Sequence, residues 1–572
     1  MANARAFRLV ALILALALLP GAAFAAATIT VVNMDGPGEG FNDPAAVAPV
    51  GGNPGTTRGA QRLIAFQHAA NIWGAVLDSP ETIYVQASFD PLTCTATGAT
   101  LGAAGAIQIF ANFPGREFDN MWYHVALANK LAGGDLAPGP NGTTADDIVA
   151  FFNSNLNGNP ACLGGRKFYL GLDANHGIDI DLVTVLLHEF GHGLGFANFV
   201  TEATGSRPLG LDDIFSEYTL DVSTGKRWNE MTTAELVASA INSRKVVWDG
   251  LHVTNAIPTV LAFGTPLLIV NSPAGLGPYD VGSASFGPPI TAPGVTGNLV
   301  RAIDPVEPGP PAGATAFDGC SPFTNAAAVA GNIALVDRGF CTFNIKAQNA
   351  QAAGAMAMIV ADNAPGAPPA GLGGVDPTIT IPSARVTQPA GNALKTALGS
   401  GMVNVTLGVD LSVRAGTEAT TGLAHLNAPN PVQPGSSISH WDPIAFPNQL
   451  MEPSINGDLT HSVQPPEDLS LKEMTDIGWF SDGDGVPDGR DACLGSTATV
   501  VIDGCDSGVA NDVFADGCTI SDAVNACAAG AANHGAFVSC VTKVTNNFKK
   551  QGLLTGAEKD AIQGCAAGAN IP

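Results

Sequence analysis

Positive charge is scarce in this chain. It has 25 lysines and arginines against 50 aspartates and glutamates, which gives a formal net charge of −25 at pH 7. Nucleic acids and anionic lipid surfaces are bound mainly through clustered positive charge. We therefore expect neither nucleic acid nor a charged membrane surface as a partner. The negative excess instead suits solubility and the binding of divalent cations.

Long apolar runs are also lacking beyond the N-terminus. Residues 257–270 are apolar but are interrupted by Pro258 and Pro266. A membrane-spanning helix needs about 20 consecutive apolar residues. We therefore expect no stable membrane span.

The N-terminus has the pattern of an export signal. Arg5 and Arg8 precede an apolar run over 9–19, and Ala23-Phe24-Ala25 offers a small-residue cleavage site. This order is typical of a signal peptide, here over residues 1–25, and the run is too short to anchor the chain. It predicts a secreted, extracellular protein.

No two cysteines lie three positions apart, which argues against a cysteine zinc cluster. The chain has ten cysteines, all after the predicted signal peptide. An even number in an exported chain predicts disulfides. Six of the cysteines fall between 493 and 565, so we expect a Cys-rich C-terminal region over 494–572 whose pairing the sequence leaves open.

Charged residues make up only 13% of the chain, whereas glycine and proline number 68 and 40. This mixture favours short strands and loops over long helical bundles, and so an α+β fold. Apolar spacing predicts helices over 57–78, 124–132 and 146–156, and the alternation at 83–89 predicts a strand.

The strongest signal is His188-Glu189-Phe190-Gly191-His192, an HExxH motif. On a helix, residues i and i+4 share one face, so both imidazoles can bind one metal ion. Zinc lowers the pKa of a bound water to about 7, and Glu189 is placed to act as general base toward that water. A catalytic zinc site has three protein ligands and one open position.

The third ligand is not local. Gly195 follows His192 by three residues, as in the metzincin pattern HExxHxxGxxH, but Asn198 stands where that pattern has its last histidine. An amide oxygen is a poor zinc ligand beside imidazoles. A residue farther along must complete the site, and Glu217, His461 and His440 are the candidates.

A later segment favours one of these candidates. His440-Trp441-Asp442 is followed by Leu450-Met451 and by a stretch ending in Asp476-Ile477-Gly478-Trp479. This order resembles the leishmanolysin family, in which a long insertion separates the HExxH helix from a His-Trp third ligand. The resemblance implies His440 as third zinc ligand and Met451 as the methionine turn beneath the metal.

The region between the two halves resembles the protease-associated (PA) domain. Cys320, the apolar run 333–336, Cys341 and the helical pattern ending at Gly354 carry this resemblance. It implies a β-rich inserted domain with no catalytic role, in which Cys320 and Cys341 are a candidate disulfide. The predicted architecture is therefore a zincin-type catalytic domain that is split by an insertion; its parts are 28–245 (with the HExxH helix), the PA domain at 250–412, and 420–480.

An acidic segment follows at 481–493. It resembles a thrombospondin type 3 repeat, and its closely spaced carboxylates, with glycines between them, suit calcium. The candidate calcium ligands are Asp482, Asp484, Asp488 and Asp491.

Two functions from different classes fit these patterns. The first is a secreted zinc endopeptidase that acts on protein or peptide substrates, with Zn²⁺ and Ca²⁺ as cofactors. The second is an extracellular binding protein that keeps the zincin and PA scaffolds without catalysis. An intact Glu189 favours the first, because a general base has no role in a protein that only binds.

Overall fold

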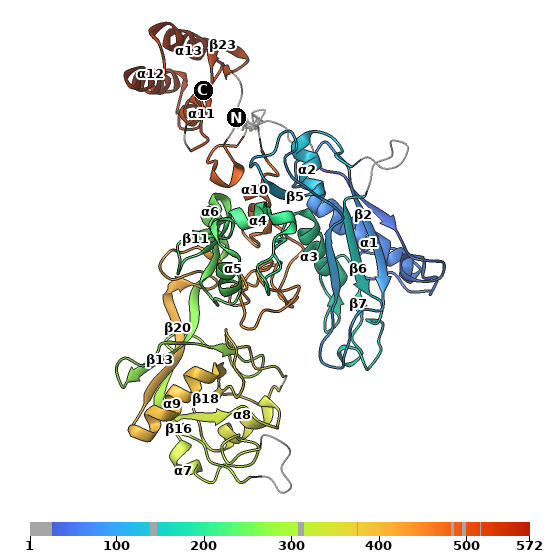
Figure 1. Ribbon diagram of the computed structural model, residues 1–572, viewed down its shortest axis with the longest axis vertical. Coiled ribbons are helices and arrows are strands. Elements are labelled where there is room, and N and C mark those ends of the chain that lie inside the picture. Colours follow the sequence, from blue (N-terminus) through green and yellow to red (C-terminus); the bar gives the residue numbers. More distant parts are fainter. Residues whose placement is uncertain are drawn as a thin grey trace, which may run out of the picture.

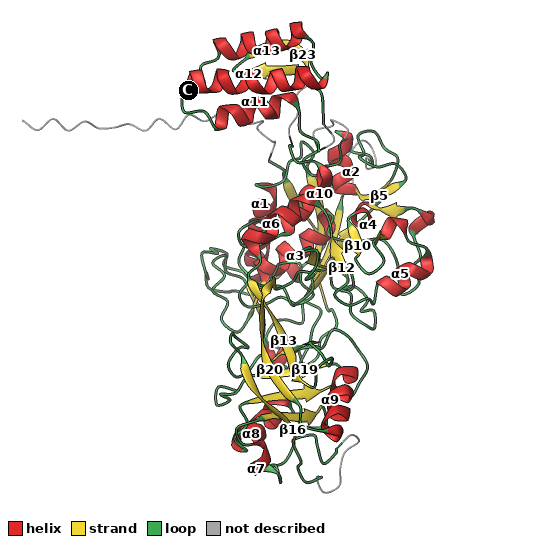
Figure 2. Ribbon diagram, turned by 90° about the vertical axis from the view of Figure 1, so that its left-hand side faces the viewer, coloured by secondary structure: helices red, strands yellow, loops and turns green. Residues whose placement is uncertain are grey.

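The computed structural model describes residues 26–137, 146–306, 314–374, 376–481, 486–494, 499–514 and 516–571. The predicted signal peptide, 1–25, lies outside these ranges. Figures 1 and 2 show a central body, the inserted domain extending from it on two long strands, and a small helical unit at the opposite end. No helix within the described ranges has the length and apolar character that crossing a bilayer requires.

The N-terminal sheet has the strand order β1-β2-β6-β3; the first three strands are parallel and β3 is antiparallel to β6. β2 buries every second residue, as its alternation predicts. The helix expected over 146–156 is wrong: Ile148–Asn153 is strand β6, because its β-branched and aromatic residues fit a strand with neighbours on both sides. The strands are β1 (Ile29–Asn33), β2 (Ile83–Asp90), β3 (Gly102–Ala106) and β6 (Ile148–Asn153).

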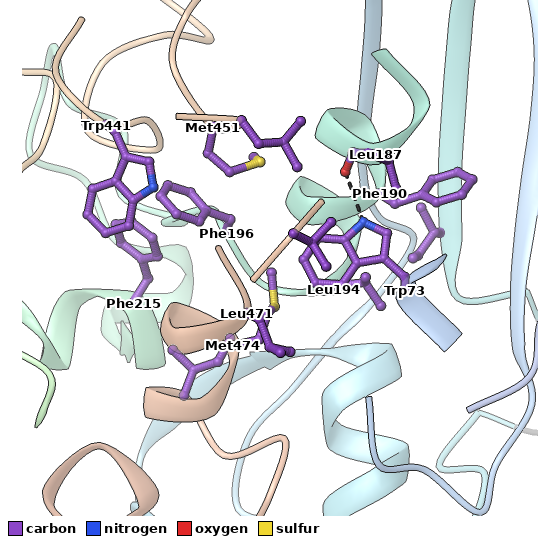
Figure 3. Close-up of a cluster of buried hydrophobic side chains, with 14 of the residues drawn as sticks. Trp73, Leu187, Phe190, Leu194, Phe196, Phe215, Trp441, Met451, Leu471 and Met474 are labelled. Atoms are coloured by element: carbon purple, nitrogen blue, oxygen red, sulfur yellow. Dashed lines mark hydrogen bonds between the residues drawn. The ribbon is translucent and has the colours of Figure 1, made fainter. Parts of the chain in front are cut away.

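Two helices, α1 (Arg58–Gly74) and α3 (Leu182–Leu194), pack against this sheet and against each other. Each begins at a side-chain cap, Thr57 for α1 and Asp181 for α3. The fully buried Trp73 donates its indole N–H to the carbonyl of Leu187 at 3.0 Å (Figure 3). This bond fixes α1 against the helix that carries the HExxH motif.

Short elements continue the central body between and after these helices. They place loops around α3 without adding to the main sheet. They are β4 (Ile109–Phe110), β5 (Met121–His124), α2 (Val125–Ala132), β7 (Phe168–Tyr169), β8 (Ile180–Asp181), β9 (Asp212–Asp213), α4 (Ile214–Glu217), β10 (Thr219–Asp221), β11 (Lys226–Arg227) and α5 (Thr233–Ser239).

A second small sheet joins the chain before and after the insertion. β12 (Val246–Trp248) pairs with β10 on one side and with β21 (Ala424–His425) on the other. The apolar residues of α6 (Leu251–Val260) and α10 (Ser470–Asp476) share one core with α1 and α3. The inserted sheet therefore begins at β13 (Phe263–Ser272), later than the expected boundary at 250, because α6 packs in the central body.

Asp476 and Trp479 explain why the second half closes on the first. Asp476 is buried, accepts the indole N–H of Trp248 at 2.8 Å and caps the start of α6 at the N–H of His252 at 2.7 Å. Trp479 donates its indole N–H to the carbonyl of Leu194 at 3.0 Å, at the end of α3. The segments flanking the insertion are thus tied directly to the HExxH helix.

The inserted domain is built on an eight-stranded sheet in the order β14-β13-β20-β16-β17-β18-β19-β15. The central strands β16 to β19 are parallel, and the two in the middle, β17 and β18, are buried on both faces and are accordingly almost continuous apolar runs. α8 covers one face and α9 the other, and a disulfide joins Cys320 to Cys341. The elements are β14 (Tyr279–Asp280), β15 (Gly282–Ser283), β16 (Val295–Arg301), α7 (Ala326–Val329), β17 (Ile333–Asp337), α8 (Phe343–Ala352), β18 (Ala357–Ala361), β19 (Ser383–Val386), α9 (Gln388–Ser400) and β20 (Asn404–Arg414).

The C-terminal unit has a hairpin, three helices and a core of its own. Three disulfides hold it, Cys493–Cys518, Cys505–Cys565 and Cys527–Cys540, and the fifth disulfide of the chain, Cys94–Cys162, lies in the central body. Covalent links of this kind compensate for the small core of a short domain. The elements are β22 (Thr499–Ile502), β23 (Cys505–Ala510), α11 (Ile520–Ala529), α12 (His534–Gln551) and α13 (Gly556–Gly568).

Candidate metal centre

Helix α3 places its two histidines on one face. Asp181 caps the helix by accepting the N–H of Val183 at 3.0 Å, and the residues that follow are almost all buried. One turn apart, His188 and His192 bring their Nε2 atoms to 3.1 Å from each other. Two nitrogens of a tetrahedral zinc site with Zn–N bonds of 2.0–2.1 Å lie about 3.3 Å apart, so this spacing fits one shared ion.

His440 joins them from the far side of the insertion. Its ring centroid lies 5.2 Å from that of His188 and 4.7 Å from that of His192. One ligand nitrogen from each of the three lies within 4.8 Å of the others. In the part of the chain that the structure describes, this trio is the one convergence of three or more metal-binding side chains.

Backbone carbonyls fix the orientation of all three rings. The Nδ1 atom contacts the carbonyl of Leu450 at 2.8 Å in His188, that of Phe196 at 2.8 Å in His192 and that of Ser436 at 3.0 Å in His440. A carbonyl only accepts, so each Nδ1 must donate, and each Nε2 keeps its lone pair. Outer contacts of this type are the usual supports of histidines that bind a metal.

Burial keeps these imidazoles neutral. It lowers the pKa of His188 to about 4 and that of His192 to about 3, and it holds the pKa of His440 well below its ordinary value. The neighbouring histidines of the trio add to the effect for His192 and His440. Neutral imidazole is the form that binds a metal, so near pH 7 protons compete little for the site.

Glu189 follows His188 directly in α3 and is 5% exposed. Burial raises the pKa of its carboxyl to about 8, and a hydrogen bond from the backbone of Ala104 opposes part of the rise. A carboxyl with a pKa near neutrality suits proton transfer. Its close neighbour is strand β3: a Cβ atom added at Gly102 would lie 2.8 Å from Oε1 of Glu189.

Met451 packs directly against α3 at Gly191. Its sulfur would lie 2.6 Å from a Cβ placed on Gly191, so glycine is needed there for the two segments to approach. Figure 3 shows Met451 beside α3, in the same apolar cluster as Phe190, Phe196 and Trp441. The residue before it, Leu450, supplies the carbonyl that orients His188. The turn at Leu450 and Met451 thus helps to position His188.

The two other candidates for the third ligand, Glu217 and His461, make contacts away from the trio. Glu217 is buried in α4, where its carboxylate accepts hydrogen bonds from Arg490 and Asn229. His461 contacts Asp181 through Nε2 at 2.6 Å, at the opposite end of α3 from His192. Neither belongs to the converging trio.

The proposed calcium segment is described in part. Asp482 and Asp484 lie outside the described residues. Asp488 and Asp491 are buried and accept backbone N–H groups, from Phe480 at 2.9 Å and from Cys493 at 2.7 Å. Calcium binding by this segment stays a prediction.

Sequence patterns did not reveal several residues that shape the site. The carbonyls of Leu450, Phe196 and Ser436 carry no side-chain signal, since any residue supplies them. Gly102 could have been noticed only as part of the unusually small sequence Gly-Ala-Ala-Gly-Ala of β3. Its role depends on a contact with a residue far along the chain.

The inserted domain matches a known family. The model of the PA domain matches residues 295–394, within the expected 250–412. This identifies the insertion as a PA domain, and the match leaves the rest of the chain unassigned.

Two curated relatives match short stretches of the chain. Vacuolar-sorting receptor 2 of Arabidopsis thaliana is 48% identical over 75 residues, which are 12% of each chain. Leucine aminopeptidase 2 of Trichophyton rubrum is 38% identical over 92 residues, 16% of this chain and 18% of the relative. The chain therefore spans less than a fifth of the length of these relatives.

Among solved structures, an aminopeptidase from Aneurinibacillus sp. strain AM-1 is 24% identical and covers 26% of this chain and 31% of its own, with a TM-score of 0.20. A zinc aminopeptidase from Bacillus subtilis, BSAP, is 21% identical over 28% of this chain and 36% of its own, with a TM-score of 0.19. Scores this low carry no conclusion about the whole molecule.

Proposed function

We propose that this protein is a secreted zinc-dependent endopeptidase of the leishmanolysin-like, metzincin type. The observation that carries the proposal is the convergence of His188, His192 and His440 around one point, with Glu189 next to His188 on the same helix. Three neutral imidazoles form a donor set that zinc prefers and leave its fourth position open. When bound there, zinc supplies Lewis acidity toward a carbonyl oxygen and a water that ionises near neutral pH.

Glu189 performs the proton transfers in this proposal. Its carboxylate takes a proton from the water that attacks the scissile carbonyl, and the C–N bond then breaks. The same carboxyl returns that proton to the leaving amine. The apolar surroundings that raise its pKa also make protonation in mid-reaction less costly.

Strand β3 supports a peptide as substrate. It is the last strand in the order β1-β2-β6-β3, so its outer edge has no strand partner among the described residues. An extended peptide can pair with such an edge through its main chain. Because β3 runs beside Glu189, a peptide bound along it would pass next to the proposed general base.

Metal removal provides the first test. We expect the purified full chain to hydrolyse casein, to lose that activity when a chelator removes zinc, and to regain it with about one equivalent of zinc. Casein that stays intact with the zinc-loaded protein would favour the binding-protein alternative instead.

Blocked peptides separate two kinds of peptidase. Several relatives are named as aminopeptidases, and removal of N-terminal residues is therefore the competing specificity. An endopeptidase cleaves a peptide blocked at both ends, whereas an aminopeptidase needs a free N-terminus. We expect cleavage of the blocked peptide.

A second test concerns the fit between β3 and the base. Gly102→Ala places a methyl group 2.8 Å from Oε1 of Glu189 and 2.9 Å from its Cγ, so the carboxyl must move. Since a displacement of about 1 Å can cost about 10²-fold in rate, we expect kcat to fall by about 10- to 100-fold with zinc affinity unchanged.

The matched control is Gly105→Ala on the same strand, where an added Cβ meets nothing within 4 Å. It should stay within about twofold of wild type in kcat, as surface changes of this kind are close to neutral. Equal kcat values for the two variants would contradict the placement of Glu189 beside β3.

A further inference from the structure

Asn198 occupies the position where a metzincin has its third histidine, and the structure shows what it does instead. It follows α3 by four residues and is half-buried. Its Nδ2 donates to Oγ of Ser439 at 2.9 Å and to Oε1 of Glu202 at 3.1 Å. Its backbone N–H donates to the same Ser439 oxygen at 3.1 Å.

The contact joins two distant parts of the chain. Asn198 and Ser439 are separated by 241 residues, and the residue after Ser439 is His440. The chain that follows the HExxH helix is therefore hydrogen-bonded to the segment that carries the third histidine, His440. Both donors converge on one side-chain oxygen, so a single hydroxyl receives the whole contact.

The chemistry of the contact requires an amide at 198. Oδ1 accepts the N–H of Val200 at 2.9 Å, while both Nδ2 hydrogens are used by Ser439 and Glu202. Only an amide offers an acceptor on one side and two donors on the other. A carboxylate at this position would lose both donors and would face the carboxylate of Glu202.

The segment before His440 needs such a restraint. Ile438 is fully buried and has a φ of 65°, a left-handed conformation that a β-branched residue rarely adopts. Such a conformation is unfavourable and persists only where the surrounding contacts hold it. The N–H of Ile438 donates to the carbonyl of Asn427 at 2.7 Å, and the N–H of Asn427 donates to the carbonyl of His440 at 2.8 Å.

We propose that Asn198 is a positioning residue for the third zinc ligand, holding Ser439 so that the strained turn presents His440 to the other two histidines. The inference rests on the proposed zinc function. It gives Asn198, which stands at the third-ligand position of the metzincin pattern, a role other than metal binding. Asn198 would instead hold the segment that carries His440, the proposed third ligand.

Zinc affinity of the full chain, measured by competition with a chromogenic chelator, tests this. Losing an outer support of a ligand typically weakens metal binding by 10–100-fold. We expect that loss for Ser439→Ala and for Asn198→Ala. Ser439→Thr keeps the hydroxyl and should stay within about threefold of wild type.

The double variant Asn198→Ala/Ser439→Ala distinguishes a shared contact from two separate packing effects. If the Asn198 side chain acts through Ser439, the double variant loses no more affinity than Ser439→Ala alone, which already removes both hydrogen bonds to the hydroxyl. Fold changes that multiply would overturn the proposal, and so would a Ser439→Ala protein that binds zinc as tightly as wild type.

Zinc binding by the wild-type protein separates a failure of the proposed function from a failure of the positioning role. A wild-type protein that holds no zinc would overturn the proposed function together with this inference. Normal binding by wild type together with unchanged binding by either single variant would overturn the positioning role alone.

Discussion

Glu189→Gln should lower kcat/KM for casein or a blocked peptide by about 10²–10⁴-fold, the usual contribution of a general base. Glutamine has nearly the same shape but cannot take up the proton of the attacking water. The residue is outside the converging trio, so its replacement removes no metal ligand. We therefore expect zinc content and zinc affinity close to wild type.

The informative comparison is with an exposed glutamate. Glu467 is solvent-exposed and is not part of the histidine trio, so Glu467→Gln should retain wild-type kinetics. A Glu189→Gln protein that keeps more than about a tenth of the activity would show that another group acts as base. Loss of zinc from the same variant would instead give Glu189 a role in holding the metal.

His440→Ala should weaken zinc binding by more than about 100-fold, beyond what the loss of an outer support causes. It removes one of three nitrogens and leaves an apolar gap where a buried polar group stood. Activity should fall in parallel, because the metal is lost. Competition with a chromogenic chelator measures the affinity directly.

Glu217→Gln is the matched variant for the rival site. It weakens the contacts with Arg490 and Asn229 and should leave zinc affinity within about threefold of wild type. The reverse order of effects, with Glu217→Gln losing zinc and His440→Ala keeping it, would assign the third ligand to Glu217. That result would replace a metzincin-type centre by a thermolysin-like one.

The helical spacing of His188 and His192 and the alternation in β2 were predictable because they depend on local periodicity. The misassigned strand β6 shows the limit of that signal. Short apolar runs such as Ile148–Asn153 fit a helix or a buried strand equally well, and the partners β2 and β3 decide between them.

The third ligand, His440, was predicted, but not from local periodicity. Nothing in the local sequence links His440 to a helix on the other side of an inserted domain, and only the resemblance to a known family favoured it. The Asn198–Ser439 contact and the left-handed turn at Ile438 were not predictable, since both depend on how the chain returns after the insertion. The start of the inserted sheet at β13 was not predictable for a similar reason: α6, which precedes it, packs in the central body through contacts with distant segments.

An anomalous-diffraction map of crystals grown with zinc, recorded on both sides of the zinc edge, tests the central claim most directly. Our account predicts one strong zinc peak at 2.0–2.1 Å from the Nε2 atoms of His188, His192 and His440, the bond length of zinc to imidazole. A map with the zinc elsewhere, or with His440 turned away from the ion, would contradict it.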